Sequence, residues 1–331
     1  MRVHVIQAGI LDTLQDMGRR GYGAWGINVG GAMDRFAAQA ANALVGNEAG
    51  EAVIEMHFPA AQLLFDTDCL ISVTGADFKP YIDDVPVNTW KPLLVRQGSS
   101  LVFRGRRWGC RCYMAVHRGF GAAPWLGSIS TNLKIGTGGL TGRALKNGDI
   151  IPLLTGLPEV FRSRAEAGAL PWSISWEDVY TADDRVFFTT GREWNWLSKA
   201  SQQAFMEQAW RIDSRSDRMG YYLSGSPLMF DERRELLSSA VSFGTVQALP
   251  DGGMVVLMAD HQTTGGYPRV AHIASAHIPK LAQLGAGDTL RFAILNLDDA
   301  EKMLLSQKAR IERIVRSCLD KLQAYGQAHR S

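Results

Sequence analysis

The chain has 331 residues, with 35 Lys and Arg against 33 Asp and Glu, and a formal net charge of +2. This near balance argues against a protein that binds nucleic acid through general electrostatics. No apolar run reaches the roughly 18 residues of a membrane span, and we expect no signal peptide and no membrane. The scattered cysteines favour reduced thiols in a cytoplasmic protein rather than disulfides or a metal site.

Short strands separated by glycine-bearing turns are predicted along most of the chain, and helices are few. The first helix is predicted over Gly31–Gly46, where apolar residues recur at helical spacing. Runs rich in β-branched and apolar residues then predict strands at Cys69–Val73, Ser100–Phe103, Arg111–Val116, Val186–Thr189 and Met254–Met258. A short helix over Lys199–Trp210 is a further possibility.

The C-terminal region predicts a long amphipathic helix that Asp298 and Asp299 would cap. One face is apolar and the other carries Lys302, Lys308, Arg310 and Arg313. Packing against the protein or a partner is the favoured interpretation of this helix. Binding to a membrane surface is left as the alternative.

Three segments beginning at Gly98, Gly148 and Gly287 share a pattern in which a glycine and a small polar residue lead into a strand. The repetition suggests related β units used more than once. We expect a first β half at 1–118 with one helix, a glycine-rich crossing segment at 119–184, a second β half at 185–297, and the C-terminal helix at 298–331.

The segment Asp260–Pro268, DHQTTGGYP, combines polar groups with glycine directly after an apolar strand. Gly265 and Gly266 would let backbone N–H groups approach a ligand closely, and Tyr267 could stack on a flat substrate. A strand-end loop of this kind suits an anion, a small amide or an acyl group. The alternative is a hairpin turn whose polar side chains only satisfy backbone groups.

A second candidate segment, Ser214–Gly220, carries two arginines that could grip a carboxylate or a phosphate. These are Arg215 and Arg218, and a surface network through Asp217 is the competing interpretation. No P-loop pattern occurs, and the histidines are too scattered to indicate a metal site. His261, inside the candidate loop, is the one histidine that we would test as a proton carrier.

Several motifs taken in chain order together resemble one known family. They are TLQDMGRRGY, GAMD, ANALVGN, VTGAD, GSIST, SDRMGY and ADHQTTGGYP, between about Val5 and Phe292. The chain resembles the biotin-dependent carboxyltransferase-like family, which includes allophanate hydrolase subunit 2, the KipA proteins and the C subunit of 5-oxoprolinase. The resemblance implies mainly β architecture, with cyclophilin-like β-barrels in two related halves.

The resemblance also implies a function as one component of an ATP-dependent 5-oxoprolinase, working with a homologous B-type subunit (KipI-like, or allophanate hydrolase subunit 1-like) and an A-type subunit. The complex would open the lactam of 5-oxoproline to glutamate, with ATP implied although this chain has no nucleotide motif. Two alternatives stay open: a carboxyltransferase that uses carboxybiotin supplied in trans, and a KipA-type regulatory binding protein.

On this hypothesis the residues fall into two groups. The expected acids or bases are Asp260, Asp34 and Asp77. The expected substrate-binding residues are Gln262, Thr263, Thr264, Gly265, Gly266, Tyr267, Arg215, Arg218, Asp16 and Arg19. Four positions depart from the usual family motifs, namely Tyr222, Ser239, Ala240 and His277. These departures leave an altered substrate or a non-catalytic partner role as alternatives.

Overall fold

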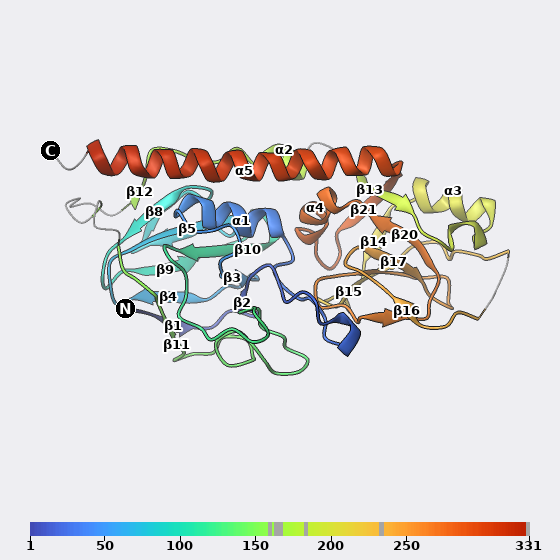
Figure 1. The fold of residues 1–331 in the computed structure, drawn as a ribbon, viewed down its shortest axis with the longest axis horizontal. Helices are drawn as coiled ribbons and strands as arrows, with labels where there is room; N and C mark the ends of the chain where they lie inside the picture. Colours follow the sequence, from blue (N-terminus) through green and yellow to red (C-terminus); the bar gives the residue numbers. More distant parts are fainter. Residues whose placement is uncertain (158–160, 162–167, 182–184, 232–234, 329–331) are drawn as a thin grey trace. The chain divides into compact units, whose positions relative to one another are not determined.

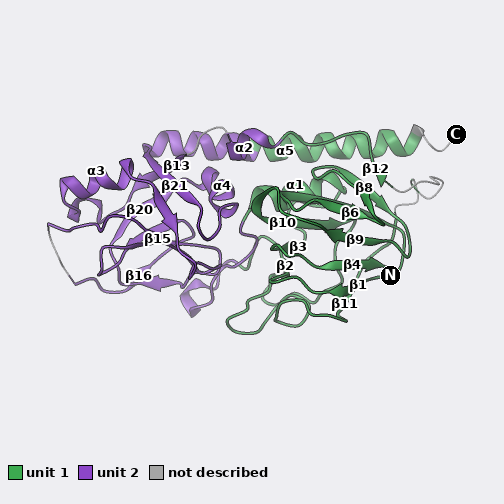
Figure 2. Cartoon of the chain, turned by 180° about the vertical axis from the view of Figure 1, so that it is seen from behind, with its two compact units in different colours: residues 1–19, 34–175, 309–331 green, residues 20–33, 176–308 purple. Residues whose placement is uncertain are grey.

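The computed structural model describes residues 1–157, 161, 168–181, 185–231 and 235–328. Its elements are drawn in Figure 1, and the chain divides into two units, coloured separately in Figure 2. Unit 1 comprises Met1–Arg19, Asp34–Ser175 and Ala309–Ser331, and unit 2 comprises Arg20–Met33 and Trp176–Lys308. The division differs from the expected boundaries, because 119–175 belongs to unit 1 and 20–33 to unit 2.

Unit 1 contains two six-stranded antiparallel sheets. The first has the order β11-β1-β4-β9-β6-β7, with β1 (Arg2–Gln7), β4 (Gln62–Phe65), β6 (Pro80–Ile82), β7 (Val85–Pro86), β9 (Ser100–Phe103) and β11 (Ile150–Pro152). The second has the order β12-β8-β5-β10-β3-β2, with β2 (Thr13–Gln15), β3 (Val53–Met56), β5 (Cys69–Asp77), β8 (Pro92–Val95), β10 (Trp108–Val116) and β12 (Gly168–Ala169).

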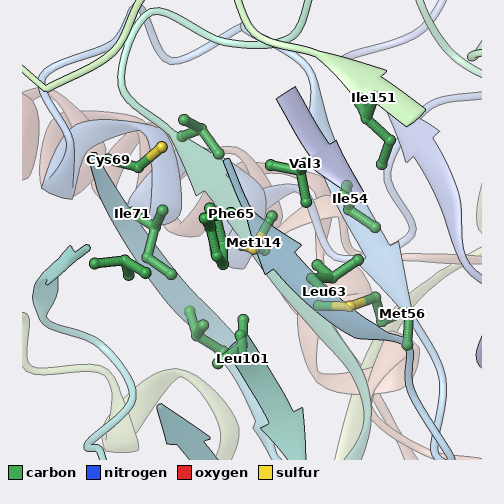
Figure 3. Packing of buried hydrophobic residues seen from close by; sticks show 14 of the residues in the cluster. Val3, Ile54, Met56, Leu63, Phe65, Cys69, Ile71, Leu101, Met114 and Ile151 are labelled. Carbon is green, nitrogen blue, oxygen red and sulfur yellow. The ribbon is translucent and has the colours of Figure 1, made fainter. Parts of the chain in front are cut away.

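The core of unit 1 draws side chains from both sheets. Figure 3 shows part of this cluster, in which Phe65 and Leu101 of the first sheet meet Ile71 and Met114 of the second. These four side chains are essentially inaccessible to solvent. Helix α1 (Arg35–Leu44) packs on β5 and β10, and its apolar face is almost wholly buried.

Unit 2 is built around a closed seven-stranded barrel. Its order is β13-β20-β17-β18-β15-β14-β21, with β13 (Arg185–Thr190), β14 (Trp210–Ile212), β15 (Gly220–Ser224), β17 (Thr245–Ala248), β18 (Met254–Leu257), β20 (Arg269–Ile273) and β21 (Thr289–Ile294). A separate two-stranded ladder joins β16 (Ser239–Ala240) to β19 (Thr264–Gly265). The barrel closes through the parallel pair β13 and β21.

The remaining helices are short, apart from the last. They are η1 (Gly23–Trp25), α2 (Glu177–Thr181), η3 (Trp194–Trp196), α3 (Lys199–Glu207), η4 (Ser275–His277), α4 (Ile278–Ala282) and α5 (Leu297–Ala328). Among the described residues, no helix combines the length and the apolar character that a membrane crossing requires.

The predicted strands are all present, and the expected C-terminal helix is confirmed as α5. Two local expectations were wrong. The cap of α5 is Asn296, whose Oδ1 accepts the Asp299 N–H at 2.8 Å, rather than Asp298 or Asp299. The strand predicted at Cys69–Val73 does not end there but continues to Asp77, with Gly75 (φ 75°) at a register shift against β10.

The repeated turn predicted from the glycines is confirmed. Gly98, Gly148 and Gly287 have φ values of 87°, 82° and 90°, a region that glycine enters without steric penalty. Each precedes a strand by two residues: β9, β11 and β21 respectively. The pattern therefore marks one kind of entry turn, used twice in unit 1 and once in unit 2.

Candidate functional site

The candidate site in unit 2 is the segment Asp260–Pro268, which we call the QTTGG loop. It follows β18, where Met258 and Ala259 are still buried, and it leads into β20. The barrel strands therefore hold both ends of the loop. Its middle is more open, and Thr264, Gly266 and Tyr267 are exposed.

A buried ion pair anchors the start of the loop. Arg218 Nε lies 2.8 Å from Asp260 Oδ2, and one Nη lies 3.0 Å from Oδ1. The same Nη donates to the Gly31 carbonyl at 2.8 Å. The two side chains are only 4% and 10% exposed. The structure thus brings together two predicted residues, but in a pair that positions the loop; the guanidinium fork faces Asp260, not an open substrate site.

The side-chain amide of Gln247, which we call the brace, supports the middle of the loop through two hydrogen bonds. Gln247 of β17 donates to the Tyr267 carbonyl at 3.3 Å and accepts from Gln262 at 3.4 Å. A Cβ at Gly265 would lie 2.6 Å from Gln247 Nε2, so a larger residue there would have to displace the Gln247 amide. Gln247 was not among the predicted site residues, and its burial within a strand (1% exposed) gave no sequence signal.

The two threonines sit at a backbone ladder. Thr264 and Gly265 pair with Ser239 and Ala240, and the Thr263 carbonyl accepts the Val241 N–H at 3.1 Å. Although β19 is paired with β16 in this ladder, the Thr264 side chain remains exposed. The positions of two family departures, Ser239 and Ala240, are therefore adjacent to the loop itself.

A cavity of about 470 Å³ adjoins the far end of the loop. Tyr267, 46% exposed, lies on its wall. The remaining lining residues are mostly apolar, namely Trp196, Phe230, Glu235, Leu236, Ala248, Leu249, Pro250, Gly266 and Pro268. The loop therefore offers hydroxyl and amide groups at its centre and an aromatic wall at its end.

Two histidines and one glutamate make polar contacts within the loop or in the adjoining strands. His261 is buried, and its Nδ1 lies 2.5 Å from the Gln262 carbonyl. His272 Nδ1 lies 3.3 Å from Thr245 Oγ1, and burial lowers the pKa of His272. Burial opposes the ionisation of Glu193, but hydrogen bonds from Arg269 hold its pKa below the ordinary value. The Glu193–Arg269 pair fixes the start of β20 and was not predicted.

Arg215, the other predicted arginine of unit 2, is an exposed side chain. Its Nε lies 3.0 Å from Asp213, and the guanidinium lies over the Tyr222 ring at 5.0 Å. Tyr222, one of the four positions that depart from the usual family motifs, thus provides a stacking partner for Arg215. The structure does not bring Arg215 into the buried pair that Arg218 makes.

The other predicted residues lie in unit 1, and two of them organise loops. Asp16 accepts hydrogen bonds from Gly18, Ser128, Ile129 and Ser130 at 2.5–2.7 Å. Arg19 is 1% exposed, donates to the Ser130 carbonyl and lies 4.9 Å from the Trp125 ring centroid. Both side chains hold the GSIST segment in place, a role that the sequence left open.

The last two predicted acids have local structural partners. Asp34 is fully buried and caps α1, accepting the Ala37 N–H at 2.9 Å. Asp77 binds Arg107 at 2.8 Å and accepts the Lys79 N–H at 2.8 Å. In the described parts of the chain, no cluster of His, Cys, Asp and Glu could hold a metal ion.

Comparison with known proteins identifies the family of the chain. The family model for the carboxyltransferase domain, subdomain A and B, matches residues 25–294. The chain belongs to this family. It is 37% identical to the C subunit of the 5-oxoprolinase of Escherichia coli K12, over 94% of this chain and 96% of that protein. The corresponding protein of Haemophilus influenzae is 36% identical, over 92% and 94%.

Solved structures support the same fold. The crystal structure of the K. lactis urea amidolyase matches 95% of this chain with a TM-score of 0.85 and 26% identity. This chain spans only 20% of that protein. The mainly β architecture implied by the resemblance is therefore confirmed, with a closed barrel in unit 2 and two sheets in unit 1.

Proposed function

We propose that the chain is the C-type subunit of an ATP-dependent 5-oxoprolinase and works with B-type and A-type subunits. One observation carries the proposal: two relatives, both named as the C subunit of 5-oxoprolinase, match almost end to end, at 37% and 36% identity. Urea amidolyase of Saccharomyces cerevisiae is only 25% identical, and the chain covers 18% of it.

The QTTGG loop would contact the lactam. Gln262, Thr263 and Thr264 carry amide and hydroxyl groups that can bind the ring carbonyl and stabilise charge that develops on its oxygen. The pyrrolidone ring would lie against Tyr267. Resonance stabilises the lactam C–N bond, so ring opening needs coupling to ATP, which the complex and not a motif of this chain would bind.

Asp260 and Arg218 then have a supporting role in this proposal. Each satisfies the charge of the other within a buried pair, so neither needs a substrate group as a partner. Their function is to fix the first residue of the loop relative to β15 and β18. We therefore assign substrate contact to the exposed part of the loop and positioning to this pair.

The test is reconstitution. The chain is co-produced with B-type and A-type subunits, and phosphate release is measured with and without 5-oxoproline. We expect ATP hydrolysis that depends on 5-oxoproline and on all three subunits. Thr264→Val should lower kcat/KM about tenfold or more, since it removes a loop hydroxyl. Thr181→Val, a matched exposed threonine on α2, should not; a folded complex without turnover would refute the proposal.

A carboxyltransferase that takes carboxybiotin in trans is the second candidate. The structural match to the urea amidolyase over 95% of the chain favours it. The two candidates differ in one measurement: transfer of labelled bicarbonate carbon to an acceptor amide requires a biotinylated carrier. Transfer in the presence of that carrier, without 5-oxoproline-dependent phosphate release, would establish the second candidate.

A further inference from the structure

A basic groove lies in unit 1, and none of the residues assigned above is among those that line it. It has a volume of about 290 Å³ and runs between the segment Trp172–Ser175 and one face of α5. From the helix it is lined by Arg310, Arg313, Ser317 and Lys321. The spacing of three or four residues places these side chains on one face of the helix.

The charge of the groove is one-sided. Two arginines and one lysine line it, and no Asp or Glu is among its lining residues. Arg313 and Lys321 are exposed, and neither has an ion-pair partner in the parts of the chain that the structure describes. Cations that line one groove repel one another, and a bound anion reduces that cost.

One of the cations is already held in position. An Arg310 Nη donates to the Ser175 carbonyl at 2.7 Å, and the guanidinium lies 5.5 Å from the centroid of the Phe36 ring. These contacts already restrict the rotamers of Arg310, so binding a ligand there costs less side-chain entropy. A partly preorganised arginine distinguishes the groove from an ordinary solvated helix face.

The opposite wall supplies neutral donors. Trp172 is 8% exposed, and its indole Nε1 has no hydrogen-bond partner among the residues that the structure describes. Ser173 and Ser175 add hydroxyl groups on this wall, and Ser317 adds one from α5. A buried donor without an acceptor costs about 1–3 kcal/mol, so a shift of this side chain that brought Nε1 to an acceptor in the groove would remove that cost.

We propose that this groove binds the phosphate group of a small molecule. Three cations without an acid suit a phosphate, which carries roughly −1.5 to −2 at neutral pH, better than a carboxylate with a single charge. Arginine binds phosphate through its planar fork, and lysine adds a point charge. The phosphate could belong to a soluble phosphomonoester or to a lipid headgroup, and the proposal does not depend on the proposed function of the QTTGG loop.

The test measures binding to the full chain. Inorganic phosphate is titrated calorimetrically at low ionic strength, with acetate as the monovalent control. We expect saturable binding of phosphate that Arg313→Ala/Lys321→Ala weakens about tenfold or more, equivalent to about 1.4 kcal/mol. The matched control is Lys308→Ala/Arg316→Ala, which removes the same two charges from exposed positions of α5 outside the groove. Circular dichroism and unfolding midpoints verify that both double variants fold.

Vesicle flotation separates the two sources of phosphate. Binding to vesicles that contain phosphatidic acid, whose headgroup is a phosphomonoester, lost in Arg313→Ala/Lys321→Ala alone, would assign a lipid headgroup. Phosphate binding without flotation would assign a soluble phosphomonoester. Two results overturn the proposal: no saturable binding of phosphate, or equal weakening in the groove variant and its control.

Discussion

Arg218 and Asp260 are joined both through their side chains and through their backbones. Besides the two guanidinium–carboxylate hydrogen bonds at 2.8 and 3.0 Å, the Asp260 N–H donates to the Arg218 carbonyl at 2.8 Å. The pair lies where β15 begins and β18 has just ended. The SDRMGY motif therefore contacts the start of the ADHQTTGGYP motif directly, and Arg218 holds the first residue of the QTTGG loop in place.

Removing one member of this pair should destabilise the protein strongly. Arg218→Met leaves the Asp260 carboxylate buried without its counter-charge, and the expected loss is about 3–5 kcal/mol in the free energy of unfolding. Urea unfolding monitored by tryptophan fluorescence measures it. Arg215→Met is the control: its ion pair is exposed, so we expect a change below about 1 kcal/mol. Similar losses in the two variants would contradict a structural role for the buried pair.

The two adjacent glycines of the loop should respond differently to alanine. A Cβ at Gly265 meets Gln247 Nε2 at 2.6 Å, whereas at Gly266 the nearest atom lies at 3.4 Å. Gln247 is buried and braces both Gln262 and Tyr267, so Gly265→Ala should displace the brace and cost about 1–3 kcal/mol. Gly266→Ala should change stability by less than about 0.5 kcal/mol.

The same two variants test the site. On the proposed function, Gly265→Ala lowers 5-oxoproline-dependent turnover in the reconstituted complex, while Gly266→Ala retains most of it. We would measure kcat/KM of the complex with each variant, and the unfolding midpoint of each variant, so that loss of turnover can be told from loss of stability. A Gly265→Ala protein with unchanged turnover would show that the brace does not shape the substrate-contacting part of the loop.

The five strands predicted by range are all present because each is a run rich in β-branched and apolar residues, whereas most of the other strands were not predicted. The sequence could not separate functional from structural acids. Asp34 occurs in a recognisable motif, but only the fold shows that its carboxylate caps α1. Arg218 and Asp260 are 42 residues apart, and Gln247 lies between Val246 and Ala248 in a short strand that carries no motif. Contacts between residues so far apart in the sequence are formed by the fold of the barrel, and no local pattern indicates them.

Asp34 provides a direct test of capping against catalysis. Asparagine caps helices about as well as aspartate, so Asp34→Asn should keep the cap, and Asp34→Ala should lose about 1 kcal/mol of stability. If capping is the role of Asp34, turnover of the reconstituted complex follows stability across the two variants. An Asp34→Asn protein of native stability that has lost turnover would instead show that the carboxylate acts as an acid or base.

Asp12 should make the stability of unit 1 depend on pH. Burial raises the pKa of Asp12 to about 7, although the N–H groups of Ala61, His57 and Gly9 donate to the carboxylate and oppose the shift. The folded state thus holds this proton more tightly than the unfolded chain, whose value is 3.8. The resulting stabilisation is complete below the unfolded pKa and is lost as the pH rises through about 7.

The measurement is the free energy of unfolding of wild type and Asp12→Asn between pH 5 and 8. Burial also lowers the pKa values of His117 and His272, which gives the opposite slope, but these groups cancel in the difference between the two proteins. Because one pKa unit corresponds to about 1.4 kcal/mol, wild type should lose about 2–3 kcal/mol relative to Asp12→Asn over this range. A difference that stays constant with pH would mean that the Asp12 carboxyl titrates at its ordinary value despite its burial.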